Sequence, residues 1–198
     1  MALGLTPQEI IAKDKNPLLR IKEGWKRVLL KDISDVQNGY AFQSKFFNRE
    51  IGLPLIRIRY INRKQTENLY SGDYDDSFIV NHNDILIGMD GDFRVSKWPG
   101  AIGLLNQRVC RLLFYSKFYN KEFLYLCLQP YLDAIHEETS SVTVKHLSSK
   151  TIKEIPLPLP PLPIQRAIVT KIENLFASLE KGIADLKKAQ EQLKVYRQ

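Results

Sequence analysis

The stretch Ile155-Pro156-Leu157-Pro158-Leu159-Pro160-Pro161-Leu162-Pro163 divides the chain into two parts of different character. Five of the eight residues from 156 to 163 are prolines, and proline excludes both helix interiors and central strands. We expect residues 156–163 to form a stiff, proline-rich spacer, because the sequence that follows is clearly helical. A ligand for an SH3-type domain is the alternative interpretation.

The sequence after the spacer, residues 164–198, predicts a long C-terminal coiled-coil helix. It contains no Pro and a single Gly, and its length corresponds to roughly 50 Å of helix. Apolar residues recur at the a and d positions of a heptad, which is the pattern of a coiled-coil seam. This seam is longer than a domain of the expected size. We therefore expect a partner helix rather than packing of the seam on the chain's own domain. The seam residues are Ile168, Ile172, Leu175, Leu179, Gly182, Leu186, Ala189, Leu193 and Tyr196.

Before the spacer, the sequence predicts a mixed α/β domain over residues 24–155, with a polar lead-in over residues 1–23. In the lead-in, Thr6 and Pro7 are suited to the N-cap and first position of a brief helix. Short apolar segments separated by turn residues indicate strands in the middle of the chain. The predicted fold class is therefore α+β: a mixed α/β domain followed by a long helix.

Two segments of this domain carry specific expectations. In residues 54–61, hydrophobic residues alternate with Arg57 and Arg59, which predicts a strand with both arginines on one face. From Asn120 onward the apolar residues recur at helical spacing, with Pro130 as a kink or boundary.

Composition excludes several classes of protein. The chain has 198 residues, of which 44% are hydrophobic and 26% charged, as in folded soluble proteins. No apolar stretch approaches the roughly 18 residues of a membrane span, and the first residues lack the order of a signal peptide. Cys110 and Cys127 lie in apolar runs and are expected to be buried thiols. We expect a cytoplasmic protein without a membrane partner.

The charge distribution indicates a polyanionic partner. Residues 20–64 contain eleven Lys and Arg against four Asp and Glu, whereas residues 67–92 contain seven acids and no Lys or Arg. Residues 93–130 are basic again, with six Lys and Arg against one Glu. Separate basic blocks of this kind favour binding to nucleic acid.

Catalytic and metal-binding motifs are missing, whereas DNA-binding residue types are present. The five Cys and His residues lack the spacing of metal ligands. The sequence also contains no phosphate-binding loop. We therefore expect no catalysis and no cofactor. Arginine reads guanine, and Asn and Gln read adenine. The predicted DNA-binding residues are Arg57, Arg59, Arg63, Lys64, Arg94, Lys97, Trp98, Asn106, Gln107 and Arg108.

The chain resembles the specificity subunits of type I restriction-modification systems over about residues 24–198. The most specific match is the junction that begins at Thr143-Val144-Lys145-His146-Leu147-Ser148 and runs through the prolines to Gln165 and residues 168–176. One departure is Pro163-Ile164 before Gln165, where relatives commonly carry an acid. A larger departure is length, since family members usually have two recognition domains and two conserved helices, and this chain has one of each.

The resemblance implies a target recognition domain that reads half of an interrupted target in double-stranded DNA. It also implies docking to methyltransferase and restriction subunits, to which S-adenosylmethionine, ATP and Mg would belong. Pairing of two chains through residues 164–198, as an antiparallel homodimer, would restore two recognition domains. Two alternatives remain open: the recognition domain of a fused restriction-methylation enzyme, or a coiled-coil interaction protein with no role in DNA binding.

Overall fold

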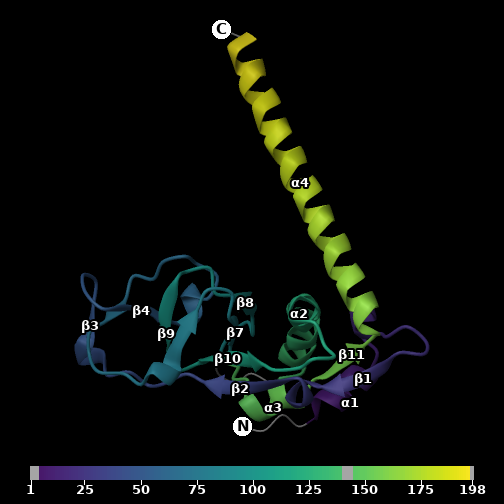
Figure 1. The fold of residues 1–198 in the computed structure, drawn as a ribbon, viewed down its shortest axis with the longest axis horizontal. Helices are drawn as coiled ribbons and strands as arrows, with labels where there is room; N and C mark the ends of the chain where they lie inside the picture. The colour runs from purple at the N-terminus through teal and green to yellow at the C-terminus, as the bar shows by residue number, and fades with distance from the viewer. Residues whose placement is uncertain (1–4, 140–144, 197–198) are drawn as a thin grey trace. The chain divides into compact units, whose positions relative to one another are not determined.

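The computed structural model describes residues 5–139 and 145–196. The chain divides into two compact units, a domain that ends at Leu159 and a helical unit that begins at Pro160. Figure 1 shows the strands of the domain and the single long helix, α4, of the second unit. Sheets and helices followed by a long helix confirm the predicted α+β class.

Within the described residues, the strands of the domain form three sheets. The two-stranded sheet pairs β1 (Lys26–Leu29) with β11 (Pro156–Leu159). The antiparallel four-stranded sheet has the order β2 (Ser34–Asn38), β10 (Val109–Phe114), β7 (Ile85–Gly88) and β8 (Val95–Lys97). The five-stranded sheet has the order β3 (Phe47–Asn48), β5 (Leu69–Tyr70), β4 (Leu53–Ile56), β9 (Ile102–Leu105) and β6 (Ile79–Asn81).

A hydrophobic core joins the four-stranded and five-stranded sheets. Strands β7 and β10 contribute from one sheet, and β4, β6 and β9 contribute from the other. Strand β7 is buried along its whole length, which is why its sequence is a continuous apolar run. The buried members of this core are Ile56, Ile61, Val80, Leu86, Trp98, Leu105 and Val109.

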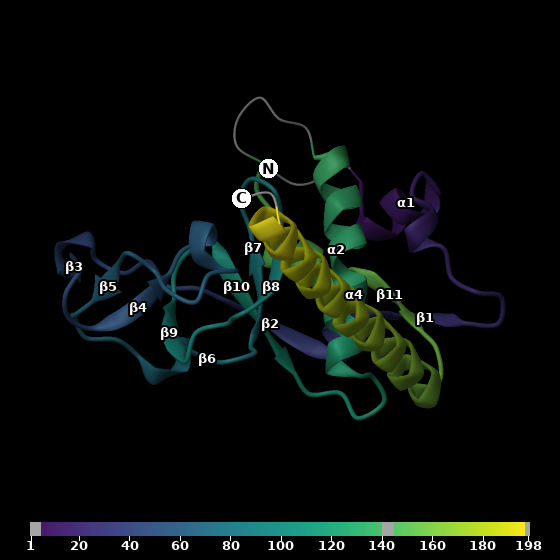
Figure 2. The ribbon, with the colours of Figure 1, turned by 90° about the horizontal axis from the view of Figure 1, so that it is seen from above.

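The helices of the domain are α1 (Pro7–Ala12), α2 (Lys121–Glu138) and α3 (Ser149–Lys153). Asn120 caps α2 by accepting a hydrogen bond from the Phe123 N–H at 2.9 Å. In Figure 2, α2 lies between the four-stranded sheet and the β1–β11 pair, and it contacts β8 and β11. The helix continues through Pro130, which rules out a helix boundary at this residue, one of the two predicted alternatives.

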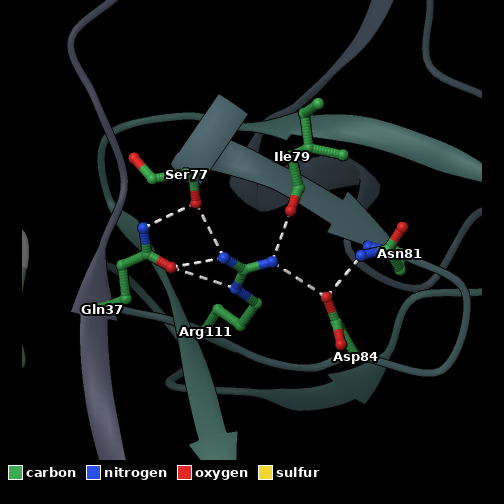
Figure 3. Close-up of polar contacts among 6 residues, drawn as sticks. All are labelled: Gln37, Ser77, Ile79, Asn81, Asp84 and Arg111. Carbon is green, nitrogen blue, oxygen red and sulfur yellow. Dashed lines mark hydrogen bonds and ion pairs between the residues drawn. The ribbon is translucent and has the colours of Figure 1, made fainter. Parts of the chain in front are cut away.

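Arg111 connects the four-stranded sheet to β6, as Figure 3 shows. This residue is 9% exposed and lies on β10. Its guanidinium donates to Gln37 Oε1 at 2.5 and 3.1 Å, and to Asp84 Oδ2 at 3.1 Å. It also donates to the backbone carbonyls of Ser77, at 2.8 Å, and Ile79. The buried cation is thus surrounded by acceptors, as burial of a charge requires.

The predicted proline-rich spacer over 156–163 needs correction. Residues 156–159 form strand β11, whose Pro156 and Leu157 are buried. Arg27 of the facing strand holds this segment, because its Nη1 donates to the Pro156 carbonyl at 2.9 Å. A two-stranded sheet tolerates proline, since each strand is an edge and needs hydrogen bonds on one side only.

The described part of the lead-in, residues 5–23, is likewise part of the domain rather than a separate segment. Thr6 caps α1 as predicted: its hydroxyl accepts the Glu9 N–H at 3.3 Å, and Glu9 Oε2 accepts the Thr6 N–H at 2.7 Å. Ile10 of α1 is 4% exposed, and α1 contacts α2. The predicted start of the domain at residue 24 is therefore too late.

Strand β4 is shorter than the predicted strand over 54–61. It ends at Ile56, and residues 58–60 form a 3₁₀ helix in which the Tyr60 N–H donates to the Arg57 carbonyl at 2.8 Å. Arg57 and Arg59 therefore do not share a strand face. The period-two pattern was misleading here because a tight turn also spaces buried and exposed residues at short intervals.

Helix α4 (Leu162–Tyr196) confirms the predicted long helix and begins two residues earlier than expected. Gln165 Nε2 donates to the Pro160 carbonyl at 2.8 Å near its start. Its large apolar residues are exposed from Leu175 onward: Leu175, Leu179, Leu186 and Leu193 are 57–72% exposed.

Candidate nucleic-acid interface

Three of the predicted arginines surround one pocket. Arg59 and Arg63 extend from the 3₁₀ turn after β4, and Arg94 extends from the loop between β7 and β8. The pocket has a volume of about 350 Å³, and Asp90 and Asp92 also line it. We call Arg59, Arg63 and Arg94 the arginine rim.

The turn after β4 places two members of the arginine rim on one ring. The guanidinium carbons of Arg59 and Arg63 lie 5.8 and 5.7 Å from the centroid of the Tyr60 ring. Tyr60 is 2% exposed, so its ring is a fixed support for both cations. The turn therefore brings Arg59 and Arg63 together on Tyr60, whereas the predicted strand over 54–61 paired Arg59 with Arg57.

A second depression continues the pocket toward α2. It has a volume of about 510 Å³ and shares Asn62, Asp92 and Arg94 with the first. Gln129 and His136 of α2 line its other side. The two pockets together form a groove between the turn after β4, the β7–β8 loop and α2, and the arginine rim lies along it.

Next to the arginine rim, Asp90 binds two basic side chains. Its Oδ2 accepts a hydrogen bond from Arg108 Nη1 at 2.5 Å, and its Oδ1 lies 2.6 Å from His146 Nδ1. Burial raises the pKa of the Asp90 carboxyl, but the hydrogen bonds from His146 and Arg108 outweigh it, so the pKa lies below its ordinary value. Asp90 is therefore ionised at neutral pH, and we call these three residues the Asp90 cluster.

The structure moves two predicted DNA-binding residues into the interior. Trp98 is 0% exposed and belongs to the core between the sheets. Asn106 is 6% exposed and lies in the turn between β9 and β10, where its carbonyl is in close contact with Gly39. Burial argues against a direct DNA contact by either residue, because an aromatic or an amide beside a turn can serve packing as well as recognition.

Lys97 is engaged within the domain. Its ammonium forms an ion pair with Glu122 of α2 and lies 4.8 Å from the centroid of the Tyr125 ring. The predicted loop around Lys97 is strand β8, which explains why its side chain is directed by the sheet toward α2. This lysine contributes less to the basic surface than the exposed arginines do.

The other predicted residues lie away from the arginine rim pocket. Arg57 is half-buried and its Nη1 is 3.5 Å from Asn68 Oδ1. Lys64 lines a separate pocket with Arg49. Gln107 is exposed at the tip of the β9–β10 turn, where its N–H donates to the Tyr40 carbonyl at 2.8 Å.

Sequence reasoning missed Asp90 and His146. The available signal for Asp90 was the glycine that follows it, because Gly91 adopts a positive φ of 69°, as expected of a glycine in a turn. His146 was part of a quoted family motif, but its partner lies 56 positions away in the sequence. The contact between Asp90 and His146 could be found only in the folded chain.

Helix α4 provides the second candidate interface. Ile168 and Ile172 are half-buried, and the seam beyond them is exposed. Phe176 and Ile183, which the predicted seam omitted, are also 57% and 45% exposed and lie one position after d residues. The side chain of Tyr196 lies outside the described residues.

Metal ligands, long apolar helices and cysteines were the remaining features to locate in the described part of the chain. Across residues 5–139 and 145–196, no group of three or more His, Cys, Asp or Glu side chains could hold a metal ion. None of the described helices combines the length and the hydrophobicity of a membrane span. Cys110 is buried as predicted, and burial raises its pKa to about 12. Cys127 is half-buried, with a pKa also raised to about 12 by burial.

Comparison with known proteins identifies the family. The chain is 42% identical, over its full length, to the EcoBI specificity subunit of Escherichia coli, and 29% identical over 88% of its length to the EcoAI specificity subunit of the same species. It spans 42% and 32% of the lengths of these two relatives, respectively.

Solved structures share the fold at lower identity. A chain from a study of the assembly and conformational transition of a type I R-M system superposes with a TM-score of 0.64 at 22% identity, over 94% of this chain and 48% of that one. The S subunit of M. genitalium gives 0.60 at 16% identity, over 84% of this chain and 43% of that one. The family model for the type I restriction modification DNA specificity domain matches residues 22–188, and the chain therefore belongs to this family.

Proposed function

We propose that this chain is the DNA-reading part of a type I restriction-modification complex and that it recognises one half of an interrupted target. The observation that carries the proposal is the arginine rim, which places three exposed cations along one groove. Arg108 adds a fourth cation beside it through Asp90. Such a surface suits the phosphates and base edges of duplex DNA.

The acidic members of the groove fit this role. Asp92 lies exposed among the arginines, and a carboxylate in a DNA interface accepts a hydrogen bond from the cytosine amino group. A surface of arginines alone would bind any duplex, whereas acids among them disfavour incorrect contacts. The mixture therefore supports sequence reading over non-specific binding.

Assembly through α4 completes the proposal. One domain reads half of an interrupted site, and the exposed Leu175, Leu179, Leu186 and Leu193 need a partner. We propose that two chains pair through residues 164–198 as an antiparallel homodimer. Two identical halves related by a two-fold axis then read an interrupted palindrome.

Catalysis belongs, in this proposal, to other subunits. The chain would dock methyltransferase subunits, which use S-adenosylmethionine, and restriction subunits, which use ATP and Mg. This chain itself binds DNA and carries no step of the reaction. A recognition domain of a fused restriction-methylation enzyme would carry the same surface, and a gene for a separate methyltransferase beside this one would favour the subunit.

Salt dependence of DNA binding tests the proposal. About six phosphate contacts would weaken affinity about a thousandfold between roughly 50 and 200 mM salt. The measurement is fluorescence anisotropy with labelled duplex DNA, using the chain alone and with the methyltransferase subunit of the same system. Binding that stays flat across this range, or that never occurs with the partner present, would exclude a DNA reader and leave the coiled-coil interaction protein.

A triple variant identifies the surface. Arg59→Ala, Arg63→Ala and Arg94→Ala together should reduce the slope of log affinity against log salt by about three, because each phosphate contact contributes about one. Arg20→Ala is the matched control, since Arg20 is an exposed arginine paired with Asp14 outside this groove. Equal slopes for the triple variant and the control would place the DNA on another face.

A further inference from the structure

Asp90 differs from the other carboxylates of the groove in being enclosed. Its side chain is 10% exposed, whereas its two partners, Arg108 and His146, are 64% and 55% exposed. Each of its oxygens contacts a different residue. The largely buried carboxylate thus anchors two side chains that extend to the surface.

The backbone around Asp90 fixes the same three segments. The Met89 N–H donates to the Arg108 carbonyl at 2.8 Å, and the Leu147 N–H donates to the Met89 carbonyl at 2.7 Å. Backbone hydrogen bonds alone therefore hold the segments around Arg108 and His146 beside Asp90, although these residues are 18 and 56 positions away in the sequence. The side-chain contacts then act on a framework that is already ordered.

Arg108 itself has an uncommon backbone conformation. Its φ is 71°, in the left-handed region that favours glycine or asparagine. The turn sets the direction of the Arg108 side chain. Backbone strain from a positive φ at a non-glycine residue is concentrated at functional sites. Its Nε and Nη2 groups make no hydrogen bond to the described part of the chain. One nitrogen is therefore held and the rest of the guanidinium is free to meet a ligand.

This arrangement suits the recognition of guanine. Guanine offers N7 and O6 as paired acceptors in the major groove, and a bidentate arginine is its commonest specific contact. An arginine already held by a carboxylate loses less rotamer freedom on binding. His146 keeps the carboxylate in its orientation, because rotation of Asp90 to release Arg108 would also break the contact with His146.

The neighbouring pair of Asp92 and Arg94 provides a contrast. These two side chains are 75% and 69% exposed, lie two positions apart, and approach only to 3.4 Å. Exposed pairs of this kind contribute little to orientation. Asp92 is therefore a matched control for Asp90: the same residue type, in the same loop, lining the same pocket.

We propose that Asp90 is a positioning residue for sequence reading, which aligns Arg108 on a guanine of the target while His146 holds the carboxylate in place. The inference rests on the proposed function, since it assumes that this surface meets DNA. It extends that function by naming the base and the side chain that reads it, and by assigning a role to an acid that does not itself touch the base.

Selection from a randomised duplex library tests this inference. The full chain, with its methyltransferase subunit, is used to enrich duplexes from a library with a randomised 20-bp segment, and the enriched sequences are compared. The wild type should enrich a motif with a guanine at one position. Asp90→Asn should reduce the preference at that position roughly tenfold and leave the other positions unchanged, as expected for one misaligned bidentate contact. Asp92→Asn should keep the guanine.

A double-variant comparison separates positioning from a purely structural role. Arg108→Ala should lose the same guanine, and Asp90→Asn combined with Arg108→Ala should lose no more than Arg108→Ala alone, because Asp90 acts through Arg108. Additive losses, or losses spread over all positions, would contradict the inference. If Asp90→Asn does not fold, His146→Gln replaces it and should weaken the preference at the same position.

The two hypotheses fail in different ways. If the wild type enriches no sequence, the proposed function fails. If the wild type enriches a motif and Asp90→Asn enriches the same motif with equal preference at every position, the positioning role fails while DNA reading stands.

Discussion

At the scale of single residues, two arginines of similar sequence context have opposite roles. Arg111 and Arg108 are three positions apart, one in β10 and one in the turn before it. Arg111 is enclosed by acceptors from Gln37, Asp84 and two carbonyls (Figure 3), whereas Arg108 is 64% exposed. The difference follows from position: Arg111 lies within β10, whereas Arg108 lies in the turn before it, with a φ of 71°.

Replacement of Arg111 should destabilise the domain strongly. Arg111→Met should cost about 2–4 kcal/mol, because the carbonyls of Ser77 and Ile79 and the Asp84 carboxylate would lose their donor. Urea unfolding followed by circular dichroism measures the change. Arg94→Met is the control, and its exposed side chain predicts a change within about 0.5 kcal/mol. Equal effects of the two substitutions would show that the Arg111 network is not needed for stability.

At the scale of elements, the N-terminal helix is attached by charge as well as by packing. Lys13 and Lys15 each place an ammonium 2.7 Å from an oxygen of Glu138, at the end of α2. Strand β11 is attached similarly, through the contact of Arg27 with the Pro156 carbonyl. Residues 5–23 of the predicted lead-in and residues 156–159 of the predicted spacer are thereby part of the domain.

The attachment of α1 should weaken in acid. Hydrogen bonds from Lys13 and Lys15 lower the pKa of Glu138 from its ordinary 4.5 to about 2. A lowered pKa means that the stabilisation is complete above pH 4.5 and is lost as the pH falls toward 2. Hydrogen exchange of the α1 amides, corrected for intrinsic rates, should show protection that falls across this range.

Substitution isolates the contribution of Glu138. Glu138→Gln should remove the pH dependence of α1 protection between pH 4.5 and 2. Glu137→Gln, a change at the adjacent exposed residue, should retain it. The same acid-induced loss of protection in Glu138→Gln would show that another group controls the attachment.

At the scale of the whole molecule, the main question is the partner of α4. Its exposed leucines follow the heptad a and d positions, and the surface they offer is characteristic of a helix with a missing partner. A homodimer through this seam has a direct consequence for DNA, because two-fold symmetry of the protein requires two-fold symmetry of the target.

Substitution in the seam should separate two chains. Leu186→Asp in both chains places charges where about 1.5–3 kcal/mol of apolar burial per leucine would otherwise stabilise the pair. Sedimentation equilibrium at micromolar concentration should find a dimer for the wild type and a monomer for the variant. Ala184→Asp adds the same charge at a position outside the seam and should remain dimeric. A monomeric wild type would overturn both the homodimer and the palindromic target.

The sequence by itself determined the features that depend on neighbours along the chain. The heptad repeat of α4, the Thr6 cap of α1 and the helical spacing of α2 are short-range patterns, and the structure confirms all three elements. The alternation in residues 54–61 was also short-range, but a strand and a tight turn produce similar patterns over a few residues. Its interpretation as one strand was therefore wrong.

Only the tertiary structure decided which side chains meet. Arg59 and Arg94 lie 35 positions apart and line one pocket, and Asp90 joins residues 18 and 56 positions away. Burial of Trp98 likewise depends on two sheets that pack around it. Sequence patterns report the periodicity of one element, whereas these contacts depend on how several elements pack, so the site became visible only in the folded chain.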